Sequence, residues 1–391
     1  MPSLQEFIEN SVSRAEIEPI KLDTPVPLEE LHTPALLIDL NVFESNLEKM
    51  QAHLVQNGMN LRAHTKMHKC PIIARRQIEA GALGVCAATV SEAEIMFAGG
   101  ISEVLITSPV LTAEKVARVV SLAAKNPGIQ IVVDHVEGAD KFNKVAKAAG
   151  VILRVLIDLD PGMGRTGIET GEAAVSLGKH VNDHCQNLKF SGLQMYAGNC
   201  MHIPGYEDRK NKYRHLMQRG IETRDQFEKA GMHVSVASGG GTGTYDMEAE
   251  LGFLTELQAG SYAFMDMEYR DIEGKGQARF DDFPISLTVL VTAISKPQSR
   301  LITVDAGFKS LASDKDAPEF RDVEGVVWHW GGDEHGIIAL NNPSADIALG
   351  DKLHVLTPHC DPTVNLHDYY FPHRDGVVEE IWPISARGRS Q

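Results

Sequence analysis

The chain has 391 residues and a mass of 42.8 kDa, which is enough for two or three domains at ~100–200 residues each. It carries 37 Lys and Arg against 53 Asp and Glu, a net charge of -16, so nucleic acids and anionic membranes are not expected partners. No apolar run approaches the ~20 residues of a membrane span, and nothing indicates a signal peptide or a framework of disulfides among the five cysteines, so a cytoplasmic location is expected.

The first two thirds of the chain predict an α/β barrel. Residues 1–33 show no clear period and are expected to form an N-terminal arm, and the strand-like run PALLIDL (34–40) precedes a helix-like segment. Eight further candidate strands then alternate with segments of helical composition, at 60–64, 84–88, 103–107, 129–134, 152–160, 190–198, 233–238 and 255–260. This alternation over 34–275 fits a (β/α)8 TIM-type barrel better than an open doubly wound sheet.

A β-rich second domain is expected over residues 276–391. Strand-like pieces such as LTVLVTAIS, RLITVDAG and HGIIAL follow one another there, separated by Gly, Pro and Asp turns without long helices. The strand at 34–40 is compatible with either domain.

The first stretch with candidate chemistry is LRAHTKMHKC (61–70), at the end of the first barrel strand. If the strand continues through it, alternation places Arg62, His64, Lys66 and His68 on one face. Such crowded cations would lower the pKa of Lys66, which a Schiff-base nucleophile requires, and would suit an anionic ligand. A solvated basic edge is the alternative.

The second stretch, DLDPGMGRTG (158–167), formally contains GxGxxG after a strand. The acidic residue expected after a second strand of a dinucleotide-binding unit is not evident, so that interpretation is poor. The glycines are instead expected to bend the chain so that Arg165 points into the barrel mouth, where a fixed cation binds an oxyanion. The competing interpretation is a plain turn with a surface arginine.

The third stretch, ASGGGTGTY (237–245), follows a late barrel strand. Its glycines let backbone N–H groups approach a phosphate, and the absence of a GK[ST] ending favours a small organic phosphate over a nucleotide. LQAGSYAFMD (257–266) at the end of the eighth strand offers further donors in Gly260, Ser261 and Tyr262. A flexible linker is the alternative.

The fourth stretch, LTPHCDPTVNLHD (356–368), lies in the β-rich part. On an extended segment His359 and Asp361 face the same way, as a divalent-ion site needs, while Cys360 points elsewhere. The carboxylate suits Mn²⁺ or Mg²⁺, whereas a thiolate there would favour Zn²⁺. A pair of surface hydrogen-bonding residues is the alternative.

With these residues placed, the chain resembles the D-threonine aldolases of the pyridoxal-phosphate fold type III group, which also contains alanine racemase and D-serine dehydratase. RAHTKMHKCP, GMGRTG, GGGTGTY, ELQAGSYAFMD and PHCDPTVNLHD carry the resemblance in this order, and it covers nearly the whole chain. It implies a barrel followed by a β domain, assembled as a homodimer. One departure is Ala88, since relatives often have glutamine near this position.

The resemblance also implies the roles of the site residues. Lys66 would form the internal aldimine with pyridoxal phosphate, Arg165 would lie near the phenolic oxygen, and Tyr196 would lie beside the ring. Around the phosphate it places Ser238, Gly239, Gly240, Gly241, Thr242, Gly243 and, from the neighbouring loop, Gly260, Ser261 and Tyr262. His359 and Asp361 match the metal ligands, with Mn²⁺ preferred over Mg²⁺.

The implied activity is that of a carbon–carbon lyase, which cleaves D-3-hydroxy amino acids and converts D-threonine to glycine and acetaldehyde. His359 or metal-bound water is the expected base, and His64, His68 and His202 have no role assigned. Asp361 stands where related dehydratases tend to have cysteine, which favours aldol cleavage over zinc-assisted elimination of water. The alternatives are a dehydratase of D-serine or D-threo-3-hydroxyaspartate and, from another class, a non-catalytic pyridoxal-phosphate carrier.

Overall fold

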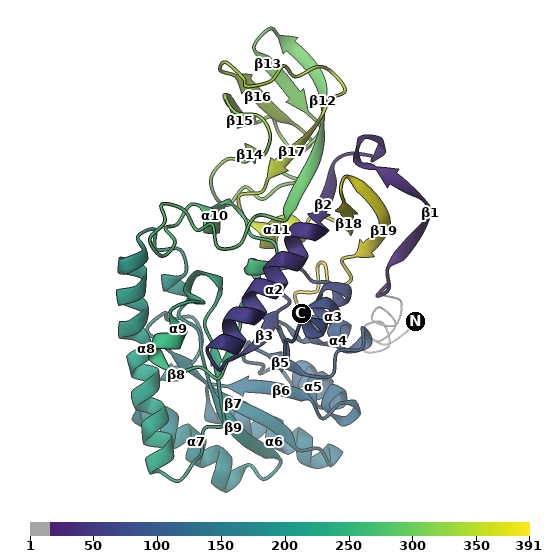
Figure 1. Ribbon diagram of the computed structural model, residues 1–391. Coiled ribbons are helices and arrows are strands. Elements are labelled where there is room, and N and C mark those ends of the chain that lie inside the picture. Colours follow the sequence, from purple (N-terminus) through teal and green to yellow (C-terminus); the bar gives the residue numbers. More distant parts are fainter. Residues whose placement is uncertain (1–15) are drawn as a thin grey trace.

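The computed structural model describes residues 16–391, and the first part of the expected N-terminal arm lies outside these residues. A barrel and a β-rich domain stand one above the other, with helix α2 running between them along one side (Figure 1). None of the described helices is long and apolar enough to cross a membrane.

Eight parallel strands close into the predicted barrel. In order around the barrel they are β3 (Asn60–His64), β4 (Gly84–Ala87), β5 (Val104–Ile106), β6 (Ile129–Val133), β7 (Leu153–Asp160), β9 (Leu188–Met195), β10 (Val236–Gly239) and β11 (Glu256–Leu257). β11 pairs with β3 and β6 pairs with β7, which closes the ring. All eight candidate strands of the sequence therefore belong to the barrel, and a two-residue strand, β8 (Ile168–Glu169), is added to β7.

Helices cover the outside of the barrel because the outward-facing side chains of the strands are apolar. The helices are α2 (Leu40–Gln56), α3 (Pro71–Glu79), α4 (Val90–Ala98), α5 (Ala113–Lys125), α6 (Val136–Ala149), α7 (Glu172–His184) and α8 (Tyr206–Lys229). Inside the barrel Cys86, Leu105, Val132 and Leu156 form a separate buried cluster, while the alternate residues of the same strands face the helices. The Asp39 carboxylate, which accepts from the backbone N–H groups of Asn41 and Val42, starts α2.

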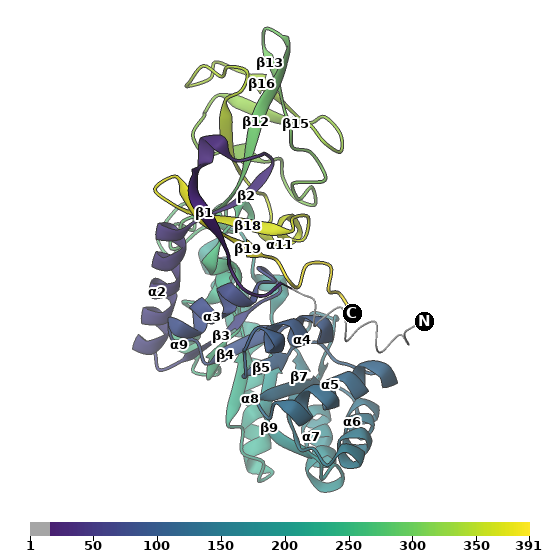
Figure 2. The same cartoon turned by 90° about the vertical axis from the view of Figure 1, so that its right-hand side faces the viewer.

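The second domain is a ten-stranded, mostly antiparallel sheet. Its members are β1 (Ile20–Pro27), β2 (Ala35–Asp39), β12 (Leu287–Gln298), β13 (Leu301–Val304), β14 (Glu319–Phe320), β15 (Val326–Trp330), β16 (Gly336–Leu340), β17 (Lys352–Leu356), β18 (Tyr369–Arg374) and β19 (Val377–Pro383). Strand β2, the run at 34–40, pairs with β12 and β18 of this sheet. Part of the expected arm forms β1, which lies along β19 (Figure 2).

Short helices lie between β1 and β2 of the second domain, where the two domains meet, and at the ends of the late barrel strands. They are η1 (Leu28–Glu30), η2 (Gly198–Cys200), η3 (Thr242–Thr244), α9 (Glu248–Leu251), η4 (Ser261–Ala263), α10 (Met267–Arg270) and α11 (Cys360–Val364). The five cysteines are all free and buried, as their spacing predicts. The α11 turn follows β17 and brings residues of the second domain to the barrel mouth.

Candidate active site

A cavity of about 340 Å³ opens at the carboxyl ends of the barrel strands. Eight of the site residues predicted from the sequence line it, namely Lys66, Arg165, Tyr196, Gly240, Gly241, Thr242, Gly260 and Ser261. Ser238, Gly239, Gly243 and Tyr262 do not line it. The Tyr262 side chain is fully buried and its hydroxyl accepts from Gln77 Nε2 at 3.2 Å, so the side chain is held by α3 beside the cavity.

The stretch after β3 is a turn, so the predicted extended face ends at His64. Only His64 and Lys66 reach the cavity. Arg62 lies inside the barrel, where its guanidinium pairs with Glu256 of β11. The buried His68 ring donates to Gln77 Oε1 at 3.2 Å. The expectation of four cations on one face is therefore wrong, because the chain turns immediately after the strand.

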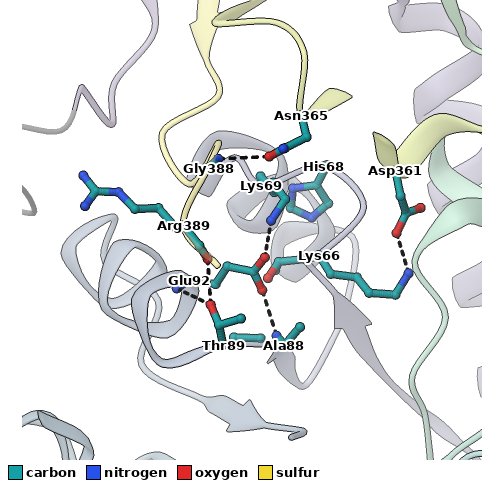
Figure 3. Close-up of polar contacts among 12 residues, drawn as sticks. Lys66, His68, Lys69, Ala88, Thr89, Glu92, Asp361, Asn365, Gly388 and Arg389 are labelled. Atoms are coloured by element: carbon teal, nitrogen blue, oxygen red, sulfur yellow. Dashed lines mark hydrogen bonds and ion pairs between the residues drawn. The ribbon is translucent and has the colours of Figure 1, made fainter. Parts of the chain in front are cut away.

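Lys66 reaches across the domain boundary to Asp361 of α11, and the two groups form an ion pair at the barrel mouth (Figure 3). Burial by itself would lower the pKa of Lys66, but the charge and hydrogen bond of Asp361 outweigh burial and raise that pKa above its ordinary value. The prediction of a lowered pKa is wrong for this arrangement. Burial raises the pKa of Asp361, but the Lys66 ammonium outweighs burial and holds it at about 2, so the carboxylate is ionised.

His359 and Asp361 stand at the start of α11, in a segment that is not extended throughout, and neither lines the cavity. His359 has extended backbone and precedes α11, and Asp361 lies in the first turn of that helix. Cys360 is buried and its backbone N–H donates to Asp266, but its thiol also donates to Asp361 Oδ2 at 3.5 Å, so the prediction that this side chain points elsewhere is wrong: α11 turns the chain and brings the thiol back to the carboxylate. His359 Nδ1 donates to the carboxylate of Asp314 at 2.8 Å, which fixes the ring. No sequence pattern had singled out Asp314.

The glycines of the second stretch bend the chain as predicted. Gly162, Gly164 and Gly167 have φ of +104°, +68° and +99°, and the Asp160 carboxylate accepts from three backbone N–H groups of the loop. Arg165 consequently lies at the cavity with its guanidinium carbon 5.1 Å from the centre of the Tyr196 ring. Arg165 is also exposed, so it lies both at the surface and at the cavity.

The late-strand loops bring bare backbone to the cavity. Gly240 has φ of +67°, and a Cβ on Gly260 would lie 2.7 Å from the His64 carbonyl oxygen, so only glycine fits there. Helices η3 and η4 both begin at the cavity, and the first N–H groups of a helix have no partner within it. These loops are short helices rather than a flexible linker, and they line the cavity with glycine backbone, as a phosphate site requires.

The polar floor of the cavity was missed by the sequence reasoning. Gln194 Nε2 donates to the buried Asp158 carboxylate at 2.8 Å, and Gln258 Nε2 donates to Gln194 Oε1 at 3.1 Å. Both glutamines line the cavity. Each stands two residues before a predicted site residue, Tyr196 or Gly260, so strand alternation could have found them.

Ala88, a departure from the family pattern, lies at the cavity. Ala88 lines the cavity, and its backbone N–H donates to Glu92 at 2.8 Å. Glu92 in turn forms a buried ion pair with Lys69, which ties the turn that carries Lys66 to helix α4 (Figure 3). A methyl group therefore faces the cavity at this position.

A second cavity of about 390 Å³ lies beside His359. Its polar lining comes from Asp314, next to the His359 ring, and from Glu268, Asp271, Lys315, Asp316 and His202. The Lys315 ammonium pairs with Glu268 at 2.7 Å. Burial lowers the pKa of His202 to about 4, so its imidazole is neutral at physiological pH. Acidic groups therefore dominate this cavity.

Two families of known domains match the chain. Residues 38–268 match the alanine racemase N-terminal domain, and residues 286–372 match the putative serine dehydratase domain. A 3-hydroxy-D-aspartate aldolase from Paracoccus denitrificans (strain Pd 1222) is 37% identical over 366 residues, which are 92% of this chain and 93% of the relative. A D-threonine aldolase from Arthrobacter sp. is 37% identical over 365 residues, 93% and 95% of the two chains.

Solved structures agree with these relationships. The crystal structure of D-threonine aldolase from Filomicrobium marinum has a TM-score of 0.90 at 35% identity and covers 95% of this chain and 100% of its own. Dehydratases are more distant. A mutant D-threo-3-hydroxyaspartate dehydratase, solved in the metal-free form, has a TM-score of 0.82 at 26% identity and covers 92% and 98% of the two chains.

Proposed function

This chain belongs to the family of D-threonine and 3-hydroxy-D-aspartate aldolases, with the alanine racemase-like fold of pyridoxal-phosphate enzymes, and we propose that it cleaves D-3-hydroxy amino acids between Cα and Cβ. D-Threonine would yield glycine and acetaldehyde. One observation carries the proposal. Lys66 of the barrel and Asp361 of the second domain meet in one ion pair, which joins the cofactor lysine and the metal carboxylate that the family resemblance implies.

The cavity residues fit pyridoxal phosphate. Lys66 supplies an amino group, Arg165 a fixed cation, and Tyr196 an aromatic face beside it. The bare backbone around Gly241 and Gly260 leaves a cradle in which backbone N–H groups would hold the phosphate. When bound, the cofactor acts as an electron sink for charge that develops at the substrate Cα.

The residues at α11 fit a divalent ion. Asp361 is ionised, and Asp314 holds the Nδ1 side of the His359 ring so that Nε2 is presented as a ligand. An imidazole and a carboxylate suit Mn²⁺, the ion we propose, with Mg²⁺ as the second choice. The ion would supply Lewis acidity at the substrate 3-hydroxyl group. A relative solved in a form described as metal-free supports a metal requirement in this group.

The acidic lining of the second cavity favours a substrate with an uncharged side chain. It adjoins His359 and is lined by four carboxylates, and its one ammonium, Lys315, is already paired with Glu268. A second carboxylate on the substrate would be repelled there. We therefore favour D-threonine and similar neutral 3-hydroxy amino acids over 3-hydroxy-D-aspartate.

A dehydratase remains the second candidate because the β-rich part matches a putative serine dehydratase domain. The carboxylate of Asp361 and the higher identity to the aldolases favour cleavage. The carrier hypothesis has less support, since His359 and Asp361 complete the mouth from a second domain. The homodimer that the resemblance implies stays a prediction.

Incubation of the holoenzyme with D- and L-threonine, with and without Mn²⁺, tests the proposal. We expect glycine and acetaldehyde from D-threonine only, with loss of activity after EDTA treatment and recovery with Mn²⁺. Ammonia and 2-oxobutyrate as the products would establish the dehydratase instead. 3-Hydroxy-D-aspartate in the same assay tests the substrate preference, and a higher kcat/KM for it would refute the argument from the acidic cavity.

Variants test the residues. Lys66→Ala is expected to abolish turnover and covalent retention of pyridoxal phosphate after borohydride reduction, while the control Lys49→Ala, a half-exposed surface lysine, retains both. Asp361→Asn is expected to lose activity and Mn²⁺ binding, with Asp368→Asn, in a surface pair with Arg387, as its control. Normal turnover of Lys66→Ala would exclude the assigned role.

A further inference from the structure

A second group of metal-ligand side chains lies on the outside of the barrel, between helices α6 and α7. Asp140 comes from α6, His180 from α7, and Cys185 directly follows α7. Asp140 Oδ1 lies 2.6 Å from His180 Nε2 and 3.6 Å from Cys185 Sγ. Within residues 16–391, these are the three His, Cys, Asp or Glu residues whose ligand atoms all fall within 4.8 Å of one another.

We propose that Asp140, His180 and Cys185 form a binding site for a divalent transition metal, most suitably Zn²⁺. Zn²⁺ binds thiolate, imidazole and carboxylate in tetrahedral geometry, whereas the oxygen-preferring Mg²⁺ and Ca²⁺ disfavour sulfur. Bond lengths of ~2.0 Å to oxygen and ~2.3 Å to sulfur put two tetrahedral ligands roughly 3.5 Å apart. The separation of 3.6 Å between the Asp140 and Cys185 ligand atoms matches this edge.

The contact between Asp140 and His180 is shorter than a tetrahedral edge and opens when an ion enters between them. An edge between nitrogen and oxygen ligands is ~3.3 Å at these bond lengths. The Asp140 side chain is 55% exposed and has room to move outward by this difference. Cys185 is buried at the base of the cluster and His180 is partly exposed, so an ion arrives from solvent and meets the thiol last. The thiol releases its proton on binding.

The fourth ligand position has a candidate on the same helix. His184 stands four residues after His180, on the same helix face, and the two ring centres are 5.2 Å apart. His184 is exposed at the end of α7, so either its ring or a water molecule completes the tetrahedron. The sequence did not reveal this metal site. Its two histidines and cysteine are close together in the chain, but the Asp140 ligand comes from another helix.

The position of this cluster separates it from the proposed aldolase chemistry. Cys185 precedes the first residue of β9, whereas Tyr196 of the cavity follows its last residue. At ~3.3 Å per residue the eight residues of β9 hold the two ends roughly 25 Å apart. The amino-terminal end of such a barrel serves stability, so the metal would join α6 to α7 without taking part in turnover.

Titration of the full-length protein with Co²⁺ tests the proposal, because thiolate ligation to Co²⁺ gives a charge-transfer absorbance, and the Cys360→Ser variant removes the thiol that lies 3.5 Å from Asp361 Oδ2. We expect this band to saturate at one equivalent in the wild type and to disappear in Cys185→Ser. Cys200→Ser and Cys360→Ser, which replace other buried cysteines, are the matched controls and should retain it. His180→Ala should weaken Co²⁺ binding roughly tenfold or more, and His184→Ala should weaken it less.

Thermal unfolding provides the second measurement and does not depend on aldolase activity. Zn²⁺ should raise the unfolding midpoint of the His359→Ala variant, which removes one of the two ligands proposed for the ion near α11, but not that of the double variant His359→Ala/Cys185→Ser. A wild type without the thiolate band, or a band that persists in Cys185→Ser, would overturn the proposal. Aldolase activity at saturating Mn²⁺ should be the same in Cys185→Ser and the wild type.

Discussion

The buried ion pair between Arg62 and Glu256 offers a sharp test of how the barrel is stabilised. Arg62 Nε lies 2.7 Å from Glu256 Oε1 and the two side chains are 3% exposed each, between neighbouring strands inside the barrel. Glu256→Gln leaves a buried guanidinium without its hydrogen-bonded counter-charge, and Arg62→Met leaves a buried carboxylate. Breaking such a pair from one side costs ~3–5 kcal/mol, because the remaining charge keeps its desolvation penalty.

The expected shift in melting temperature follows from this free energy. For a domain of ~150–250 residues, 1 kcal/mol shifts the midpoint by ~2–4 °C, so each single variant should melt roughly 6–20 °C below the wild type. The double variant Arg62→Met/Glu256→Leu should recover most of the loss, since apolar replacement of both partners is often near neutral. The exposed pair Lys49 and Asp282 is the matched control, worth ~0–1 kcal/mol.

Thermal unfolding followed by circular dichroism on the cofactor-free protein measures both effects. A Glu256→Gln midpoint no lower than that of Lys49→Ala would show that the buried pair does not stabilise the barrel. If the loss of stability in the double variant equals the sum of the losses in the two single variants, the two charges do not stabilise each other. Either result would refute the reasoning.

Three further predictions concern pH, backbone space and metal affinity. Burial raises the pKa of Glu248 from 4.5 to about 8, so the folded state holds this proton at higher pH than the unfolded state and loses stability as pH rises through that window. Glu248→Gln should remove this fall, at most ~1.4 kcal/mol per pH unit, and equal slopes of melting temperature between pH 5 and 8.5 would contradict it. Gly260→Ala places a Cβ 2.7 Å from a backbone oxygen, so it should destabilise the folded protein by ~1–3 kcal/mol and reduce the pyridoxal-phosphate occupancy measured by absorbance. The control Gly138→Ala has open space around its Cβ in α6 and should stabilise the folded protein by ~0.5–1 kcal/mol. Asp314→Asn removes the carboxylate that orients His359 and should weaken Mn²⁺ binding ~10–100-fold by calorimetry, with activity restored by excess metal. An unchanged Kd, or an equal loss in the neighbouring control Asp316→Asn, would count against that role.

Much of the fold could be predicted from the sequence because strand and helix periods are local. The eight barrel strands were recognisable from short apolar runs between amphipathic segments, and the change of pattern near residue 280 marked the second domain. The sheet to which 34–40 belongs was not decidable in this way. That run is apolar on both faces in either sheet, and only its pairing with β12 and β18 assigns it.

The position of a site residue could be predicted where the local sequence fixes the path of the backbone. Arg165 follows glycines that bend the chain, and Gly240 and Gly241 directly follow a strand, so both reach the cavity. The prediction failed where alternation was extended beyond the end of a strand. His68 left the expected face because β3 stops at His64, whereas Arg62 keeps the inner face of β3 but pairs with Glu256 and does not line the cavity.

The sequence by itself determined the two kinds of domain in this protein, a barrel and a β-rich domain, and the side chains that suit a phosphorylated cofactor and a divalent ion. Only the tertiary structure decided their charge states and partners. Lys66 and Asp361 are 295 residues apart, yet their ion pair reverses the pKa shift that local charges predict for the lysine. Electrostatic interactions act through space over a few ångströms, and distance along the chain does not report that separation.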